Sequence, residues 1–333
     1  MKIRTQIQNL NNHQVFNKVK SLACEYLNKH KYQEIDLPVL SPVLIPESYL
    51  EIFKTELING KKKEELYLTP SPELFLKRLI VQGLGSCYYL NKSFRNGDLG
   101  TSRHSPEFNI LEFYKLGSSY MDVADETLKM MRFIAKKLFG KDEIIFQRRK
   151  ISFKNLEKIS VSQAFEKYAE MTNILDKDNF FKQAKNKGYV TNGFNYSEIW
   201  SQIYVQEVEP ELGKKGKPTI IYDYPFEMAA IARFNKEKKV AERLEIYIEG
   251  VELGNCGNEV LDENKKTLNL KFNNEQKMRK KMKKFIYSPD KEFVNVIKEL
   301  PWCSGIAIGL DRLAMIFANV PSIQDLKLID FEY

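Results

Sequence analysis

Two strand-forming segments, 86–96 and 106–115, limit the fold more than any other feature of this chain. A polar loop that contains glycine separates them, and this pattern predicts an antiparallel hairpin with a long tip. Further strands are expected at 219–224 and 243–253, with helical patterns in between. Strands in separate hairpins with interleaved helices favour an α+β domain with a mostly antiparallel sheet over a doubly wound parallel sheet.

The remaining segments fit the same architecture. Helices are expected at 13–30, 72–81, 120–139, 161–206 (three helices), 261–285 and 311–318. Residues 32–40, which include Pro38, are expected to form an edge strand, and 305–309 a strand of small residues. Because 43% of the residues are hydrophobic and no Pro/Gly-rich linker occurs, we expect a single domain over 1–333 with a substantial core.

Charge and cysteine content indicate which binding partner and which cellular compartment to expect. The net charge of +8 predicts an anionic partner, although the basic runs 61–63 and 277–284 are also typical of a solvated loop and a solvated helix face. The four cysteines are far apart and are expected to be reduced and mostly buried. The chain has no signal segment and no apolar run of about 18 residues, so we expect a cytoplasmic protein without a membrane partner.

The hairpin carries the first candidate site. Arg95 leaves the first strand, where its planar guanidinium can bind a phosphate, and Phe108 on the facing strand can stack on a base. Arg103 and His104 lie at the tip. The alternative is a surface ion pair, which is common at strand ends.

The segment GIAIGLDRL carries the second candidate site. Gly305, Ala307 and Gly309 fall on one face of a strand, where a flat ligand can lie against the backbone. Arg312 follows at the start of a helix, a position that favours an anion. Tight packing is the alternative explanation for the small residues.

A third candidate is a group of carboxylates around one strand end. Glu245, Glu249, Glu252 and Glu259 suit Mg²⁺ or an ammonium group, unless they form a solvated face.

These segments resemble a known family. FRNGDLGTSRHSPEFNILEFY is similar to the second signature motif of class II aminoacyl-tRNA synthetases, and GIAIGLDRLAMIF to the third. YQEIDLPVL resembles the weaker first motif, which implies a homodimer, and TPSPELFLKRL resembles the lysine branch. The resemblance covers about 13–330.

Within that branch the chain resembles the elongation factor P–(R)-β-lysine ligases. The first motif begins so early that we expect no OB-fold anticodon domain. VEPELGKKGKPTIIYDYP and LPWCSGIAIGLDRL also match the ligases. Ser71 and Ala307 stand where the ligases carry Ser and Ala, and where lysyl-tRNA synthetases tend to have Ala and Gly.

Other positions depart from the ligases. Gly97-Asp98 replaces an expected Glu in a motif 2 loop that is one residue longer, and Ser105 replaces Asn. Cys256-Gly257-Asn258 replaces Gly-Phe-(His/Ser). Glu227, Arg233 and Gly254 look more like true lysyl-tRNA synthetases, so the pocket is a mosaic.

The resemblance implies roles for particular residues. Arg95 and Arg312 would hold the α- and γ-phosphates of a bent ATP, with Phe108 and Gly309 on the two faces of adenine. Glu252, together with Glu245, would bind Mg²⁺. Glu73 would meet the substrate's backbone-side amine, and Tyr114 and Glu259 its side-chain ammonium. Further nucleotide contacts are expected from Asn96, Gly97, Asp98, His104, Ser105, Glu252 and Leu253, and further substrate contacts from Ser71, Pro72, Asn255 and Ala307.

The function implied is ATP-dependent activation of (R)-β-lysine or lysine as an acyl-adenylate, followed by transfer to a lysine side chain of elongation factor P. A compact lysyl-tRNA synthetase that charges tRNA-Lys is one alternative. A non-catalytic module that binds RNA or protein is another, although such members usually lose a motif arginine and this chain keeps Arg95 and Arg312. The choices between α- and β-lysine, and between a protein and a tRNA acceptor, stay open.

Overall fold

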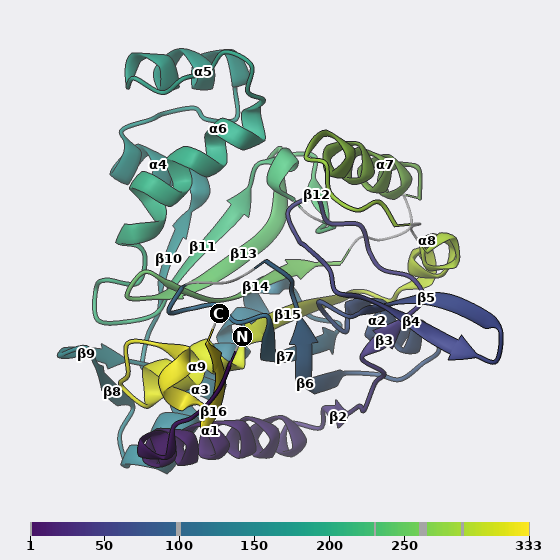
Figure 1. The fold of residues 1–333 in the computed structure, drawn as a ribbon. Coiled ribbons are helices and arrows are strands. Elements are labelled where there is room, and N and C mark those ends of the chain that lie inside the picture. The colour runs from purple at the N-terminus through teal and green to yellow at the C-terminus, as the bar shows by residue number, and fades with distance from the viewer. Residues whose placement is uncertain (1, 98–100, 230, 260–264, 288–289, 333) are drawn as a thin grey trace. The chain divides into compact units, whose positions relative to one another are not determined.

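A computed structural model describes residues 2–97, 101–229, 231–259, 265–287 and 290–332 (Figure 1). The chain divides into two compact units: Met1–Ser118 with Val260–Tyr333, and Ser119–Glu259. The single domain expected over 1–333 stays a prediction, because two compact units can belong to one domain or to two.

The first unit is built on a sheet whose strands run in the order β15, β7, β6, β2. Strands β6 (Cys87–Phe94) and β7 (Glu107–Leu116) form the predicted antiparallel hairpin, and β15 (Cys303–Gly309) pairs antiparallel with β7. The extended segment expected at 32–40 forms only the short edge strand β2 (Gln33–Glu34), parallel to β6, before the chain reaches Pro38. The pairing with β6 ends at Ile35, whose backbone N–H donates to the Tyr88 carbonyl at 2.9 Å.

Helices and smaller sheets complete the first unit. Its helices are α1 (Leu10–Lys29), α2 (Glu73–Val81), α7 (Lys265–Lys281), α8 (Lys291–Val296) and α9 (Leu310–Phe317), with a 3-10 turn η7 at Ile323–Leu326. Its smaller sheets are β1 (Lys2–Thr5) with β16 (Ile329–Glu332), and β3 (Leu40–Ser41), β5 (Lys62–Leu68) and β4 (Lys54–Asn59) in that order. Helix α1 packs on α9 through buried side chains such as Val19 and Leu27.

The basic runs are only partly solvated. Residues 61–63 and most of 277–284 are exposed, as one reading of the sequence predicted. Arg279 is the exception, because its side chain is fully buried and donates to the carbonyl oxygens of Glu47, Leu50 and Phe285. One cation of the run therefore anchors α7 to the loop at 47–50.

The strands of the second unit are ordered β10 (Glu157–Ser160), β11 (Thr219–Tyr224), β13 (Val240–Ile248), β14 (Val251–Asn258), with β12 (Phe234–Asn235) against β13. The prediction of one strand at 243–253 is wrong, because the chain turns between β13 and β14. Glu249 and Gly250 both have positive φ, 51° and 69°, and so form a tight hairpin turn. Among these five strands all pairings are antiparallel except that of β10 with β11.

Helices make up the rest of the second unit, beside the small ribbon of β8 (Glu143–Phe146) and β9 (Arg149–Ser152). Helix α3 spans Tyr120–Phe139 as predicted, and 161–206 holds the three expected helices α4 (Val161–Ala169), α5 (Lys177–Asn186) and α6 (Tyr196–Ile203). A π-helical turn, η2 (Tyr204–Val208), follows α6. Phe165 and Tyr204 stack on Trp200, with ring centroids 5.3 and 4.7 Å away. No helix in the described parts of the chain is long and apolar enough to cross a membrane.

Candidate active site

Arg95 and Phe108 form the first part of the site, in the first unit. Arg95 follows β6, and its backbone N–H donates to the Pro106 carbonyl at 2.9 Å. Its guanidinium carbon lies 5.2 Å from the centre of the Phe108 ring. The Nε of Arg95 is buried and has no hydrogen-bond partner among the described residues. A buried guanidinium donor without a partner is a ready binding point for an anion beside an aromatic surface.

Arg312 meets the loop at 101–105 from the first turn of α9. Its Nη2 lies 2.8 Å from His104 Nε2, and its Nε donates to the Arg103 carbonyl at 3.1 Å. Because arginine can only donate, His104 Nε2 accepts, and the proton sits on Nδ1, which lies 2.6 Å from Thr101 Oγ1. The structure thus brings together His104, from the N-terminal segment of the unit, and Arg312, from its C-terminal segment.

The other residues predicted to contact the nucleotide near Arg95 and His104 have different surroundings. Gly97 has a φ of 85° at a turn, and Asn96 pairs with Glu51, whose carbonyl accepts its N–H at 2.9 Å. Ser105 is buried and accepts a hydrogen bond from Lys327. Asp98 lies outside the described residues.

The small residues of β15 face particular partners on β7. Gly305 is opposite Tyr114, Ala307 is opposite Glu112, and Gly309 precedes α9. A Cβ on Gly305 would lie 2.3 Å from the Tyr114 ring, so the absent side chain makes room for that ring. A Cβ on Gly309 would meet only the Arg312 side chain, at 3.6 Å.

A buried polar network joins the substrate candidates of the first unit. Ser71 Oγ and the Tyr114 hydroxyl donate to the two oxygens of Glu112, at 2.8 and 2.9 Å. Glu73, at the start of α2 after Pro72, forms an ion pair with the buried Lys77. The predicted residues Ser71, Glu73 and Tyr114 are therefore gathered in one place.

Glu112 and Lys77 belong to this network and were missed by sequence reasoning. The available signal was a carboxylate within the otherwise apolar run ILEFY, and a lysine four residues after Glu73. Burial raises the pKa of Glu112 to about 8, the charge of Glu73 adds to the rise, and hydrogen bonds from Ser71 and Tyr114 oppose it. An ammonium group placed here would favour the ionised form of Glu112.

The four carboxylates predicted to group around one strand end of the second unit do not all lie in one cluster. Glu249, at the β13–β14 turn, forms an ion pair with Arg149 at 2.9 Å. Glu245 is buried and accepts from Arg243 at 2.6 Å and from two buried tyrosine hydroxyls, those of Tyr204 and Tyr247, at 3.1 and 2.8 Å. Both oxygens of Glu245 therefore already have donors, and its role with Mg²⁺ remains a prediction.

The other predicted residues of this unit lie on or next to β14. Asn255 is opposite Glu245, and Glu252 is opposite Tyr247, so these side chains share one face of the hairpin. Leu253, at the register shift between the two strands, is buried. Glu259 is also buried and follows β14, where it bridges to Ala232. Within the described ranges, no three His, Cys, Asp or Glu side chains are grouped to hold a metal. Glu252 carries the kind of oxygen ligand that Mg²⁺ prefers, and its role with Mg²⁺ remains a prediction.

Comparison with known families identifies the class of this site. Residues 1–329 match the family model for class II tRNA synthetases of the D, K and N type. The chain belongs to this family, and its α+β fold and its ligase class are thereby as predicted.

Individual relatives show which members of the family this chain is similar to. The "Elongation factor P--(R)-beta-lysine ligase" of Buchnera aphidicola subsp. Acyrthosiphon pisum (strain Tuc7) is 32% identical over 308 residues, 90% of this chain and 89% of the relative. The protein of the same name from subsp. Schizaphis graminum (strain Sg) is 33% identical over 317 residues. The "Lysine--tRNA ligase" of subsp. Baizongia pistaciae (strain Bp) is 32% identical over 90% of this chain but only 61% of the relative. The predicted resemblance to the elongation factor P ligases is confirmed.

Replacing Gly305 by alanine should displace the Tyr114 ring, because the new Cβ would overlap it. We expect Gly305→Ala to raise the KM for the amino-acid substrate in pyrophosphate exchange by about tenfold or more, with a smaller change in the KM for ATP. Gly309→Ala is the matched comparison, since its Cβ would lie beside Arg312 and not beside Tyr114; it should leave the amino-acid KM unchanged, and any effect should fall on the KM for ATP. A Gly305→Ala enzyme with an unchanged amino-acid KM would contradict the placement of Tyr114.

The raised pKa of Glu112 should make stability depend on pH. Between the ordinary carboxyl value, near 4.5, and about 8, the folded state keeps a proton that the unfolded state has released. The free energy of unfolding therefore falls as pH rises through this window and levels off above it. In urea titrations of the ligand-free protein, Glu112→Gln should gain stability relative to wild type from pH 5 to 8. The exposed Glu64→Gln serves as control. Parallel curves for wild type and Glu112→Gln would argue against the proton on Glu112.

Proposed function

We propose that this enzyme uses ATP to activate (R)-β-lysine or lysine and transfers the acyl group to a lysine side chain of elongation factor P. The observation that carries the proposal is the convergence of Ser71 and Ala307 on Glu112. Ser71 donates to that carboxylate, and Ala307 lies opposite it across the strand pair. These are the two positions at which the chain resembles the ligases rather than the synthetases, so both differences act on one pocket.

The proposed chemistry needs no general base. The substrate carboxylate attacks the α-phosphorus, pyrophosphate leaves, and an acyl-adenylate remains. The acceptor amine then attacks the carbonyl, AMP leaves, and an amide forms. Arg95 and Arg312 would neutralise phosphate charge and orient the nucleotide, and Phe108 would stack on adenine. Mg²⁺ held by Glu252 would add positive charge at the phosphates.

The ammonium groups of the substrate would be bound by buried carboxylates. Glu73 is already paired with Lys77, so the nearby Glu112 supplies the further negative charge that a second cation requires. Burying an ammonium without such a partner is costly, and this makes the pocket selective for a diamine acid. Glu259 is proposed to contribute in the same way. The proposed substrates and acceptor support the cytoplasm as the compartment of this enzyme.

A specific observation also favours the rival function, a lysyl-tRNA synthetase. Glu227, Arg233 and Gly254 resemble that family, and a "Lysine--tRNA ligase" is 32% identical to the chain. The discriminating property is the acceptor and not the activation step.

We also propose a homodimer, formed over a cleft of about 690 Å³ in the first unit. The cleft is lined by Phe16, Phe53, Leu68, Phe94, Leu328 and Phe331, among others. Its hairpin residues Lys92 and Phe94 alternate with Arg95, so the cleft opens on the face of the hairpin opposite to Arg95. Ile3, Ile329 and Phe331 add exposed apolar surface on β1 and β16. An apolar surface of this kind is typical of a partner interface.

Phe331→Glu should break the homodimer, because it places a charge in the apolar cleft. Light scattering after size exclusion should then give 39.0 kDa instead of twice that mass. Ile58→Glu, on the equally exposed β4, is the control and should leave the dimer intact. A wild-type protein that is monomeric at assay concentration would refute the dimer.

The acceptor is decided by competition. The enzyme receives ATP, Mg²⁺ and (R)-β-lysine or L-lysine, with elongation factor P and tRNA-Lys both present. We expect mass spectrometry to find one added lysyl-sized group on the protein and no charged tRNA. Arg95→Ala, which retains the amino-acid pocket, should give neither product. Charged tRNA beside unmodified protein would establish the synthetase function instead.

A further inference from the structure

The loop at 101–105 carries His104 to Arg312 but contains no helix or strand. Backbone carbonyls in such a loop need donors from elsewhere if its shape is to be fixed. Within the loop, Thr101 Oγ1 contacts His104 Nδ1 and accepts the N–H of Arg103. These contacts leave the loop carbonyls to be bound by other segments.

Three consecutive carbonyls of this loop accept hydrogen bonds from the C-terminal part of the chain. The Ser102 carbonyl accepts the N–H of Ile323 at 2.9 Å. The Arg103 carbonyl accepts from Arg312 Nε, and the His104 carbonyl from Gln324 Nε2, both at 3.1 Å. The loop therefore takes its shape from α9 and η7 rather than from its own residues.

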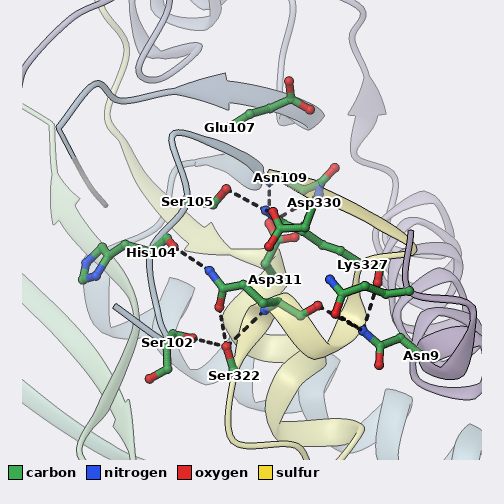
Figure 2. A network of polar contacts seen from close by, with 12 residues as sticks. Asn9, Ser102, His104, Ser105, Glu107, Asn109, Asp311, Ser322, Lys327 and Asp330 are labelled. Atoms are coloured by element: carbon green, nitrogen blue, oxygen red, sulfur yellow. Dashed lines mark hydrogen bonds and ion pairs between the residues drawn. The ribbon is translucent and has the colours of Figure 1, made fainter. Parts of the chain in front are cut away.

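A fourth contact comes from Lys327, whose ammonium donates to Ser105 Oγ at 2.8 Å (Figure 2). The same ammonium lies 3.2 Å from Asp330, which holds it in place. Ser322 Oγ also lies 3.3 Å from the Ser102 carbonyl oxygen, which shares the single hydroxyl proton with Gln324 Oε1. Together these bonds cover the loop from Ser102 to Ser105.

The C-terminal segment is itself fixed on its other side by α1 and the residue before it. Asn9 Nδ2 donates to the carbonyls of Gln324 and Lys327, at 3.3 and 3.0 Å, and Asn12 donates to that of Asp325 at 3.1 Å. The His13 ring lies 3.0 Å from the Leu326 carbonyl. Residues 322–327 therefore form a rigid bridge between α1 and the loop, as Figure 2 shows for Asn9 and Lys327.

We propose that Gln324 and Lys327 are positioning residues for the nucleotide. They fix the loop at 101–105 so that His104 and Arg312 meet the phosphates without reorganisation when ATP binds. This inference rests on the proposed function in one respect, namely that ATP is the ligand of this loop. Neither side chain hydrogen-bonds to Ser71, Glu112 or Tyr114 in the described parts of the chain, so the amino-acid affinity should stay unchanged. Lys327 also lines the cleft proposed for the dimer, which makes Gln324 the cleaner test.

Gln324→Glu is the sharpest test. The carboxylate keeps the shape of the amide and can still accept from Ser322, but it cannot donate to the His104 carbonyl. We expect the dissociation constant for MgATP, measured by calorimetry, to rise about tenfold, while the amino-acid KM stays within about twofold of wild type. Hydrogen exchange of the peptide covering the loop should be faster in the ligand-free variant.

Asp325→Asn is the matched control, because it makes the reverse exchange of carboxylate and amide one residue away and leaves the bond to His104 intact. It should match wild type in ATP affinity and in hydrogen exchange. A second test is the double-mutant cycle of Lys327→Met with Ser105→Ala, in which the two losses in ATP affinity should be less than additive. Additive losses would show that Lys327 does not act through Ser105.

Unchanged ATP affinity in Gln324→Glu would overturn the proposal. So would an equal loss of ATP and amino-acid affinity together with a lower Tm, since that pattern indicates a merely structural role. Failure of the proposed function is distinguishable, because a wild-type enzyme that activates neither form of lysine would still give an ATP dissociation constant and an exchange rate for each variant.

Discussion

The buried carboxylate of Asp311 joins the two halves of the proposed nucleotide site. It accepts the backbone N–H of Asn109 at 2.5 Å and the Asn109 side chain at 3.1 Å. Asn109 follows Phe108 on β7, and Asp311 precedes Arg312 on α9, so one contact fixes the spacing between the aromatic surface and the second arginine (Figure 2). Burial raises the pKa of Asp311, and the donors from Asn109 favour its charged form. The remaining contacts of Arg312 with the loop depend on this register.

The proposed amino-acid pocket also depends on one buried carboxylate of β7, that of Glu112. Glu112 is a buried carboxylate whose charge is governed by its neighbours, because burial and Glu73 favour the neutral acid while Ser71 and Tyr114 donate to it. Gly305 provides room for Tyr114, and Ala307 limits the space opposite Glu112. Small differences at Ser71 and Ala307 therefore act on the same carboxylate, which is a physical route from few substitutions to a changed substrate.

Most of the fold was predictable from local pattern. The hairpin of β6 and β7, the strand and helix that carry Arg312, and helix α3 follow from periodicity and from turn residues. The strand expected at 243–253 failed because Glu249 interrupts it at a positive φ, which a non-glycine residue adopts only where the surrounding structure holds it. The interpretation of 277–284 as a solvated helix face is wrong for Arg279. Nothing in a run of basic residues indicates which one will bind the backbone carbonyls of another segment.

The sequence alone determined the family, the pairing of Arg95 with Phe108 on one hairpin, and the small-residue strand before Arg312, because motif spacing and strand alternation are local properties. The tertiary structure decided what those residues touch. It brought Glu112 to Ser71 and Lys77 to Glu73, engaged Glu245 with Arg243 and two tyrosines, and bound the loop of His104 to residues 322–327. The reason is physical: the contacts of Glu112 with Ser71 and of His104 with Gln324 join residues 41 and 220 positions apart, and no local pattern encodes such contacts.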